Sequence, residues 1–226
     1  MYTNERVWRF MDDNIAQSLE KFIYTKEIKK ILASIEPGLK NNQDLSTIFL
    51  NLYEKDLIGE HELVAFQTKF MLSQFTSLME RNFTELSCGI YIHDENEMKL
   101  WNGATANVSE GYNEYSSGLS TQNDILEGDE IPVYMKEIVA IPDLERGEDI
   151  TSLNHKKDLM KNGYQSVCCS PLNYHGHVIG HSVMFSKTKR IFTQNEIKAF
   201  SMYNTLIEEK LAEIKNHLIP IIKHAR

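Results

Sequence analysis

The side chains best suited to covalent chemistry in this sequence are three cysteines, Cys88 and the adjacent pair Cys168 and Cys169. An odd number of cysteines that includes an adjacent pair is a poor framework for disulfides, and the spacing does not match a zinc site. All three fall in stretches rich in β-forming residues, and buried thiols on strands are normally inert. We therefore expect reduced cysteines, as is usual in a cytosolic protein.

Histidines are the next candidates for chemistry. His175 and His177 flank Gly176 where a turn is expected, and His155 and His181 could lie near them. A metal site needs converging ligands that a second layer of side chains orients, so we interpret this region as a turn. The sequence contains no phosphate-binding loop, no G-x-G-x-x-G, no H-E-x-x-H and no serine elbow. It therefore predicts no catalytic residues, no metal ligands and no enzymatic activity.

Composition limits the classes to which the protein can belong. The chain has 226 residues, of which 42% are hydrophobic, so it can bury a core in one or two domains. Its 24 basic and 32 acidic residues give a net charge of −8, which argues against nucleic acid as a partner. No apolar run reaches the ~18 residues that suggest a membrane span, and the polar start does not match a secretory signal. We expect a cytoplasmic protein.

Helical periodicity dominates residues 1–84, where we predict a segment of about three helices. Apolar residues recur at three- and four-residue spacing from Trp8 to Ile35, until Glu36-Pro37-Gly38 stops the pattern. A second helix is predicted to begin at Asp44, which suits an N-cap, and a third follows the break at 56–59. Each helix has one apolar face, so each needs a surface to pack against.

Residues 85–192 predict an α+β domain with a mostly antiparallel sheet. Alternating apolar residues and turn residues predict these elements: a hairpin over 86–93 and 98–104, a helix over 109–115, a helix starting near Pro132, a strand over 137–141, a helix over 155–162 capped by Gly163, and a second hairpin over 164–172 and 177–185.

A closing helix is predicted over 193–226. Thr193 and Glu196 form a capping box at its start, and Pro220 must end or kink it near its end. Its apolar stripe follows a coiled-coil register, which predicts a dimer seam with one polar residue to fix the register. The seam consists of Phe200, Asn204, Ile207, Leu211, Ile214 and Leu218. The alternative is that this stripe packs only on its own domain.

The order of short motifs over residues 86–211 resembles GAF domains, a family of small-molecule sensor modules in bacterial signal-transduction proteins. The motifs are Leu100-Trp101-Asn102-Gly103-Ala104, Glu110-Gly111-Tyr112, Ile141-Pro142-Asp143-Leu144, Gly163-Tyr164-Gln165-Ser166, Ser170-Pro171-Leu172, Gly176-His177-Val178-Ile179-Gly180 and Phe192-Thr193 with Glu196. No motif is specific alone, but their order and spacing are. PAS domains share the architecture.

The resemblance implies a ligand pocket between one face of the sheet and the helices and loops that cover it. Each strand offers alternate side chains to such a pocket. We predict that the ligand-binding residues are Trp101, Tyr112, Tyr134, Cys168, Ser170 and His181. For each residue the alternative is an ordinary place in the core.

Two features of this sequence restrict the ligand. The segment 124–149, which covers the pocket mouth in relatives, holds nine acidic residues against Lys136 and Arg146, which disfavours phosphate-bearing ligands. Many relatives also carry a loop with glycine and cysteine, of which only Gly128 remains here. The resemblance names no ligand or cofactor for this chain.

The resemblance further implies that the domain senses a small molecule and signals through its N- and C-terminal helices in a homodimer. A diguanylate cyclase or a histidine kinase is the output commonly joined to such modules. Two alternatives stay open at this point. The chain could be an interaction or dimerisation module without a ligand, or a cysteine-based enzyme similar to free methionine sulfoxide reductases.

Overall fold

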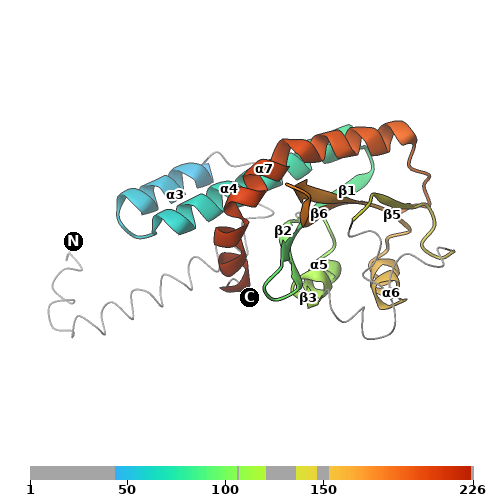
Figure 1. The fold of residues 1–226 in the computed structure, drawn as a ribbon, viewed down its shortest axis with the longest axis horizontal. Helices are drawn as coiled ribbons and strands as arrows, with labels where there is room; N and C mark the ends of the chain where they lie inside the picture. Colours follow the sequence, from blue (N-terminus) through green and yellow to red (C-terminus); the bar gives the residue numbers. More distant parts are fainter. Residues whose placement is uncertain (1–43, 106, 121–135, 147–152, 225–226) are drawn as a thin grey trace.

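The computed structural model describes residues 44–105, 107–120, 136–146 and 153–224 (Figure 1). The helix predicted from Trp8, the helix predicted near Pro132 and the candidate residue Tyr134 lie outside the described residues. The elements, in order, are α3 (Asp44–Glu54), α4 (Glu60–Asn82), β1 (Leu86–Asp94), β2 (Lys99–Ala104), α5 (Glu110–Ser116), β3 (Leu119–Ser120), β4 (Val139–Ile141), α6 (Leu153–Lys161), β5 (Ser166–Tyr174), β6 (His177–Ser186) and α7 (Gln194–His224).

These elements build a six-stranded sheet in which every neighbouring pair is antiparallel, with the order β3-β2-β1-β6-β5-β4. The predicted α+β class and both predicted hairpins are confirmed. Two-residue β3 at one edge of the sheet was not predicted, because so short a strand leaves no alternating pattern to detect.

The centre of the sheet is the pairing of β1 with β6, in which Leu86 faces Ser186 and Ile92 faces Gly180. The two backbones approach so closely at Gly180 that a Cβ atom there would overlap the carbonyl oxygen of Tyr91. Only glycine fits this position without a shift of one strand.

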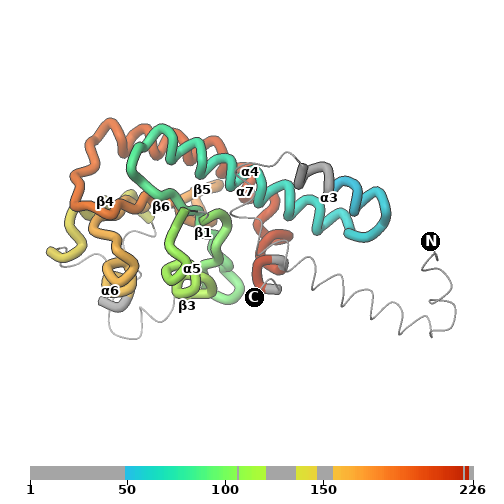
Figure 2. The backbone as a smooth tube through the Cα atoms, turned by 180° about the vertical axis from the view of Figure 1, so that it is seen from behind, coloured from blue at the N-terminus to red at the C-terminus, as the bar shows by residue number. Residues whose placement is uncertain are grey.

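Helices α4 and α7 lie side by side over one face of the sheet, as both views of the molecule show (Figures 1 and 2). They run in opposite directions, since His61 stacks on His217 at 4.7 Å between ring centroids and Phe75 meets Tyr203 further along. Their apolar faces and the strands beneath them form the larger of two buried clusters.

The stripe predicted as a dimer seam has its partners within the chain. All six residues are buried in the single chain: Phe200, Asn204, Ile207, Leu211, Ile214 and Leu218. They face the sheet and α4, so the predicted seam is not exposed to a second copy. A heptad pattern indicates only that a helix has one apolar side. In α7 that side covers the domain's own sheet.

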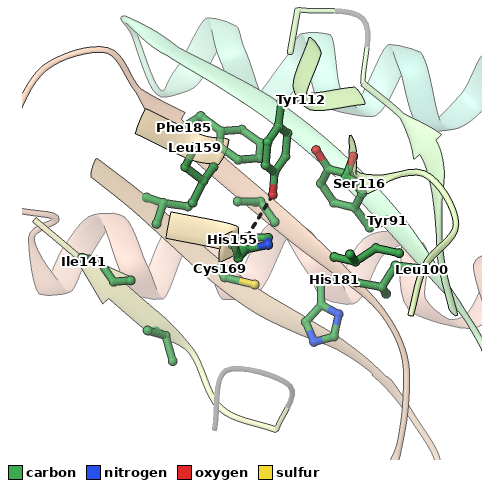
Figure 3. A pocket seen from close by; sticks show the side chains of 14 residues that line it. Tyr91, Leu100, Tyr112, Ser116, Ile141, His155, Leu159, Cys169, His181 and Phe185 are labelled. Atoms are coloured by element: carbon green, nitrogen blue, oxygen red, sulfur yellow. Dashed lines mark hydrogen bonds between the residues drawn. The ribbon is translucent and has the colours of Figure 1, made fainter. Parts of the chain in front are cut away.

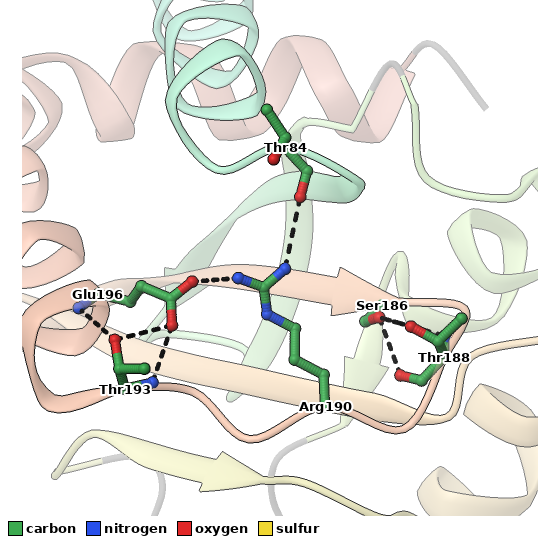
Figure 4. A network of polar contacts seen from close by, with 6 residues as sticks. All are labelled: Thr84, Ser186, Thr188, Arg190, Thr193 and Glu196. Carbon is green, nitrogen blue, oxygen red and sulfur yellow. Dashed lines mark hydrogen bonds and ion pairs between the residues drawn. The ribbon is translucent and has the colours of Figure 1, made fainter.

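The start of α7 is fixed by the predicted capping box (Figure 4). The Thr193 backbone N–H donates to Glu196 Oε2 at 2.8 Å, and the Glu196 backbone N–H donates to Thr193 Oγ1 at 3.2 Å. Arg190 pairs with the same Glu196 carboxylate and reaches the carbonyl of Thr84 at 3.4 Å. This network ties the beginning of α7 to the turn that leads into β1.

The other end of α7 is bound to the turn between β1 and β2. Pro220 lies within the helix, which continues to His224, so this residue does not end the helix. The helix bends before its end (Figure 1). Lys223 Nζ lies 2.6 Å from both Asp94 Oδ2 and Glu97 Oε1, and 5.4 Å from the ring centroid of Trp101. Burial alone would raise the pKa of Asp94, but hydrogen bonds from Lys223 and from backbone amides hold it below its usual range.

Helices α5 and α6 cover the opposite face of the sheet, below it in Figure 1. The second buried cluster lies there and is rich in aromatic rings, including Tyr91, Tyr112, Tyr164 and Phe185. The two faces of the sheet therefore differ, because the long helices α4 and α7 cover one face and the short helices α5 and α6 cover the other. Within the described residues, no helix combines the length and the apolar character that a membrane span requires.

We predict that Lys223→Met lowers the free energy of unfolding by about 1–3 kcal/mol, because it leaves the buried Asp94 carboxylate without its cation. Urea denaturation checks this. Lys210→Met is the matched control, since Lys210 pairs with Glu213 on the exposed side of the same helix and its loss should cost about 0.5 kcal/mol or less. Equal effects of the two substitutions would contradict the assigned role of Lys223.

Candidate functional site

A pocket of about 50 Å³ lies between the sheet and the two short helices α5 and α6 (Figure 3). All six strands of the sheet contribute to its wall. The aliphatic part of the lining is Leu100, Leu119, Val139, Ile141, Leu159, Val167 and Val183. The aromatic and polar part is Tyr91, Tyr112, Phe185, Ser116, His155, Cys169 and His181.

Tyr112 is the centre of the aromatic side of the pocket. Its ring makes edge contacts with Phe185 at 5.3 Å, with Tyr164 at 6.1 Å and with Tyr91 at 6.4 Å between centroids. Such edge-to-face pairs favour fixed ring orientations. Tyr112 lies in the first turn of α5. Ser109 fixes the start of this helix as its N-cap, because its side chain accepts a hydrogen bond from the Tyr112 backbone N–H at 3.3 Å.

The two covering helices are joined by polar contacts. Tyr112 Oη on α5 lies 3.0 Å from His155 Nε2 on α6, and Figure 3 shows the hydroxyl pointing at the imidazole. A second link lies next to it, because the Ser109 hydroxyl donates to Asn162 Oδ1 at 2.9 Å and the Ser109 backbone N–H donates to Tyr164 Oη at 2.8 Å. Hydrogen bonds therefore connect the two covering helices at two places.

The charge state of the pocket follows from its burial. Desolvation lowers the pKa of His155 to about 4, against a small opposing effect of Asp158, so this imidazole is neutral at physiological pH. Burial raises the pKa of Cys169, which therefore stays a thiol. The lining among the described residues includes no carboxylate, ammonium or guanidinium group.

The acidic residues described in segment 124–149 are partly neutralised. Of the nine acids counted in 124–149, Asp143 and Glu145 are among those described, and Lys189 Nζ lies 3.0 Å and 2.7 Å from their carboxylates. Arg146 also lies 3.7 Å from Asp143. The described part of this segment is thus less negative than its composition implies.

The predicted ligand-binding residues divide between the two faces of the sheet. Tyr112 and His181 line the pocket. Trp101 and Cys168 belong to the buried cluster under α4 and α7, and Ser170 is buried on that same side. The structure therefore does not bring the predicted residues together at one site.

The register of the second hairpin shows why Cys168 and Ser170 lie on the face of the sheet opposite to His181. Near the turn Tyr174 pairs with His177, but the register shifts between Leu172 and Asn173, so Ser170 pairs with Ser182 and not with His181. One extra residue in a strand reverses the face of every side chain beyond it. Cys169 consequently faces the pocket together with His181.

Two further lining residues carried some sequence signal. Phe185 shares the alternation of His181 on β6, and His155 precedes the glycine-capped end of a predicted helix. At that end Gly163 has φ +82° and Tyr164 N–H donates to Leu159 C=O at 3.1 Å, which confirms the predicted cap. Phe185 and His155 meet in one pocket because α6 packs against the sheet, a long-range contact that the sequence pattern does not reveal.

The cysteines and histidines do not form a reactive centre in the described part of the chain. The three cysteines are free thiols, and burial raises the pKa of Cys168 to about 12 and that of Cys88 further. A thiolate nucleophile is therefore disfavoured. Among the described residues, no three His, Cys, Asp or Glu side chains gather as metal ligands would, and His175 and His177 are exposed at the hairpin turn.

Comparison with known proteins identifies the fold. No protein-family model and no curated protein matches the sequence. Among solved structures, the GAF domain region of a protein from Geobacter sulfurreducens is 14% identical, with a TM-score of 0.53 over 68% of this chain and 99% of that one. The PixJ GAF domain of Thermosynechococcus elongatus, in its blue-light absorbing form, is 14% identical, with a TM-score of 0.52 over 71% and 96%.

A third similar structure is a domain of a protein from Sinorhizobium meliloti described as a two-component sensor histidine kinase. It is 16% identical and has a TM-score of 0.50 over 63% of this chain and 88% of that one. All three chains are covered almost completely, and the matched architecture is the curled antiparallel sheet with helices on both faces. The chain therefore contains a domain with the GAF fold.

Proposed function

We propose that this chain is a sensory domain that binds an uncharged small molecule in the pocket between the sheet and helices α5 and α6. The observation that carries the proposal is the pocket's lining, which is apolar and aromatic with a few neutral polar groups and no charged side chain among the described residues. Few convergent polar groups in a mostly apolar pocket are typical of sites for small organic ligands.

The chemistry of the lining restricts the ligand. A charged molecule would lose its hydration in this pocket without meeting an opposite charge, which is costly. A molecule with a flat apolar ring would pack against Tyr91, Tyr112 and Phe185, and a single donor or acceptor on it would suit His155. At about 50 Å³ the pocket holds a few water-sized groups, so a larger ligand requires α5 and α6 to move outward together.

The similar structures support a sensory function, since one comes from a protein described as a sensor histidine kinase and another is a light-absorbing GAF domain. In our proposal the domain works in the cytoplasm of a bacterium, and its helices pass the signal to an output domain such as a histidine kinase or a diguanylate cyclase. The small volume favours one alternative, an interaction module whose pocket is filled by its own side chains.

Native mass spectrometry of the freshly purified full chain tests ligand binding. We predict a non-covalently bound small molecule that is lost in Val139→Phe, which fills the pocket from edge strand β4. The control is Val178→Phe, the same exchange on a strand but outside the lining, which should keep the molecule. If no molecule is bound and neutral aromatic compounds such as indole raise the melting temperature of neither the native chain nor the control, the interaction module is the better account.

The buried neutral imidazole predicts a pH dependence of stability. His155 takes up a proton near pH 6.5 when unfolded but near pH 4 when folded, so the free energy of unfolding is highest above pH 6.5 and falls as the pH is lowered towards 4. We expect a loss on the order of 3 kcal/mol from this group. His155→Gln should flatten this part of the profile, whereas His177→Gln, on the exposed turn, should leave it unchanged. If the free energy of unfolding has the same slope against pH in the native chain and in both variants, this pH dependence does not come from His155.

We also propose that the domain acts as a homodimer, and that it self-associates through the outward side of α7 because the seam is buried. Met202 and Leu206 lie one turn apart on that side and are 63% and 69% exposed. Light scattering at micromolar concentration should find a dimer for the native chain and a monomer for the double variant Met202→Glu with Leu206→Glu. A native chain that is monomeric with and without ligand would exclude this route.

A further inference from the structure

A small polar cluster lies on the helix-facing side of the sheet, directly behind the pocket. Its members are Ser170 on β5, Ser182 on β6 and Asn204 on α7, each at most 1% exposed. The Ser182 hydroxyl donates to Asn204 Oδ1 at 2.7 Å. Around them the interface between α7 and the sheet is apolar. In the buried part of this interface, hydrogen bonding thus adds to apolar contact in positioning α7 on the sheet, and at its exposed edge the Asn173 backbone N–H on β5 donates to Glu208 Oε1 on α7 at 2.8 Å.

The hydrogen bonding of the cluster is incomplete. Asn204 Nδ2 is buried and has no hydrogen-bond partner among the described residues. A buried amide donor without a partner costs free energy, so an arrangement that satisfies it competes with the one observed. Ser170 offers such an arrangement, because it is directly paired with Ser182 on the neighbouring strand.

The side chains of directly paired residues lie close enough for one amide group to reach either. In the observed arrangement Asn204 accepts a hydrogen bond from Ser182. In a second arrangement, with α7 displaced towards β5, Asn204 Nδ2 would donate to the Ser170 hydroxyl, whose present bond to Pro171 O is long at 3.5 Å. The two strands thus each place one serine hydroxyl on the side of the sheet where Asn204 lies.

The same two strands carry the pocket on their other face. His181 and Val183, which flank Ser182, line the pocket, and so does Cys169, which precedes Ser170. Because neighbouring residues of a strand point to opposite faces, a change in the spacing of β5 and β6 at the pocket also changes the distance between the two hydroxyls behind it.

We propose that Asn204 transmits the state of the pocket to α7 by exchanging its hydrogen bond between Ser182 and Ser170, which moves the helix across the sheet. The mechanism rests on the sensory function proposed above, since it needs a pocket whose occupancy changes. Binding biases the two positions only as far as the ligand distinguishes between them.

The experiment follows amide hydrogen exchange in α7 of the full chain and uses Val139→Phe to fill the pocket, so that no ligand has to be known. We expect Val139→Phe to change the exchange rates of amides around residues 200–211 by about fivefold or more, the lower end of typical coupling between sites. The change in the exchange rates of α7 should disappear when Val139→Phe is combined with Asn204→Leu. The exchange rates of amides in β5 and β6 should still change.

Ser170→Ala gives an independent test that leaves the observed Ser182–Asn204 bond in place. It should abolish the response of α7 to Val139→Phe, whereas Ser73→Ala should preserve it. Ser73 is the matched control because it is also a buried serine, but it lies on α4, away from Asn204, where the loss of its hydroxyl breaks no hydrogen bond among the described residues. This pair of variants decides the question even if Asn204→Leu fails to fold.

The proposal is overturned if α7 does not respond to pocket filling, or if it responds equally with and without Asn204 and Ser170. The outcome is separable from the proposed function. If the native chain retains a ligand but the response of α7 is the same with and without Asn204, only the proposed switch of the Asn204 hydrogen bond is refuted. A response that depends on Asn204, in a chain that retains no ligand, would refute the sensory function alone.

Discussion

The pairing of β1 with β6 is the constraint on which the rest of the structure depends. It joins residues 86–94 to residues 177–186 at the centre of the sheet and divides the remaining strands into two wings. At its end, Gly180 packs against the backbone at Tyr91, a residue whose ring lines the pocket. The position of the pocket is thus fixed by a backbone contact that tolerates no side chain.

Because the sheet is antiparallel and buried on both faces, each strand serves two environments at once. On one face, α4 and α7 cover an apolar cluster that has a polar contact at Ser182 and Asn204. On the other, α5 and α6 cover aromatic rings and a small pocket, and a Tyr112–His155 contact holds these helices together. Successive side chains of a strand point to opposite faces, so a displacement of the strand backbone on the pocket side also moves the side chains that face α4 and α7.

Local patterns were sufficient to predict most of the fold. The hairpins, the capping box at Thr193 and the glycine cap at Gly163 each depend on a few neighbouring residues, and each is found where it was expected. The same short-range information could not decide which face of a strand meets the pocket. The faces of Cys168, Cys169 and Ser170 relative to His181 depend on a single register shift near Leu172, which no short pattern in the sequence indicates.

The apolar stripe of α7 marks a second limit of pattern reading. Its spacing suits a coiled coil and a sheet-covering helix equally well, because both present one apolar side to a partner. The difference lies in what the partner is, and the burial of Phe200 and Leu211 in the single chain identifies it as the domain's own sheet. The asparagine in the stripe has a specific neighbour, Ser182, that no property of α7 alone could indicate.

The strand order has a consequence for biosynthesis. β6 is the last strand to be made but occupies the centre of the sheet, so one edge of β1 stays without its neighbour until almost the whole domain has left the ribosome. An unpaired strand edge is prone to pair with other chains, and sheets closed by such distant contacts form slowly. A nascent chain that ends before residue 186 would therefore need α4, or a chaperone, to shield β1 from aggregation.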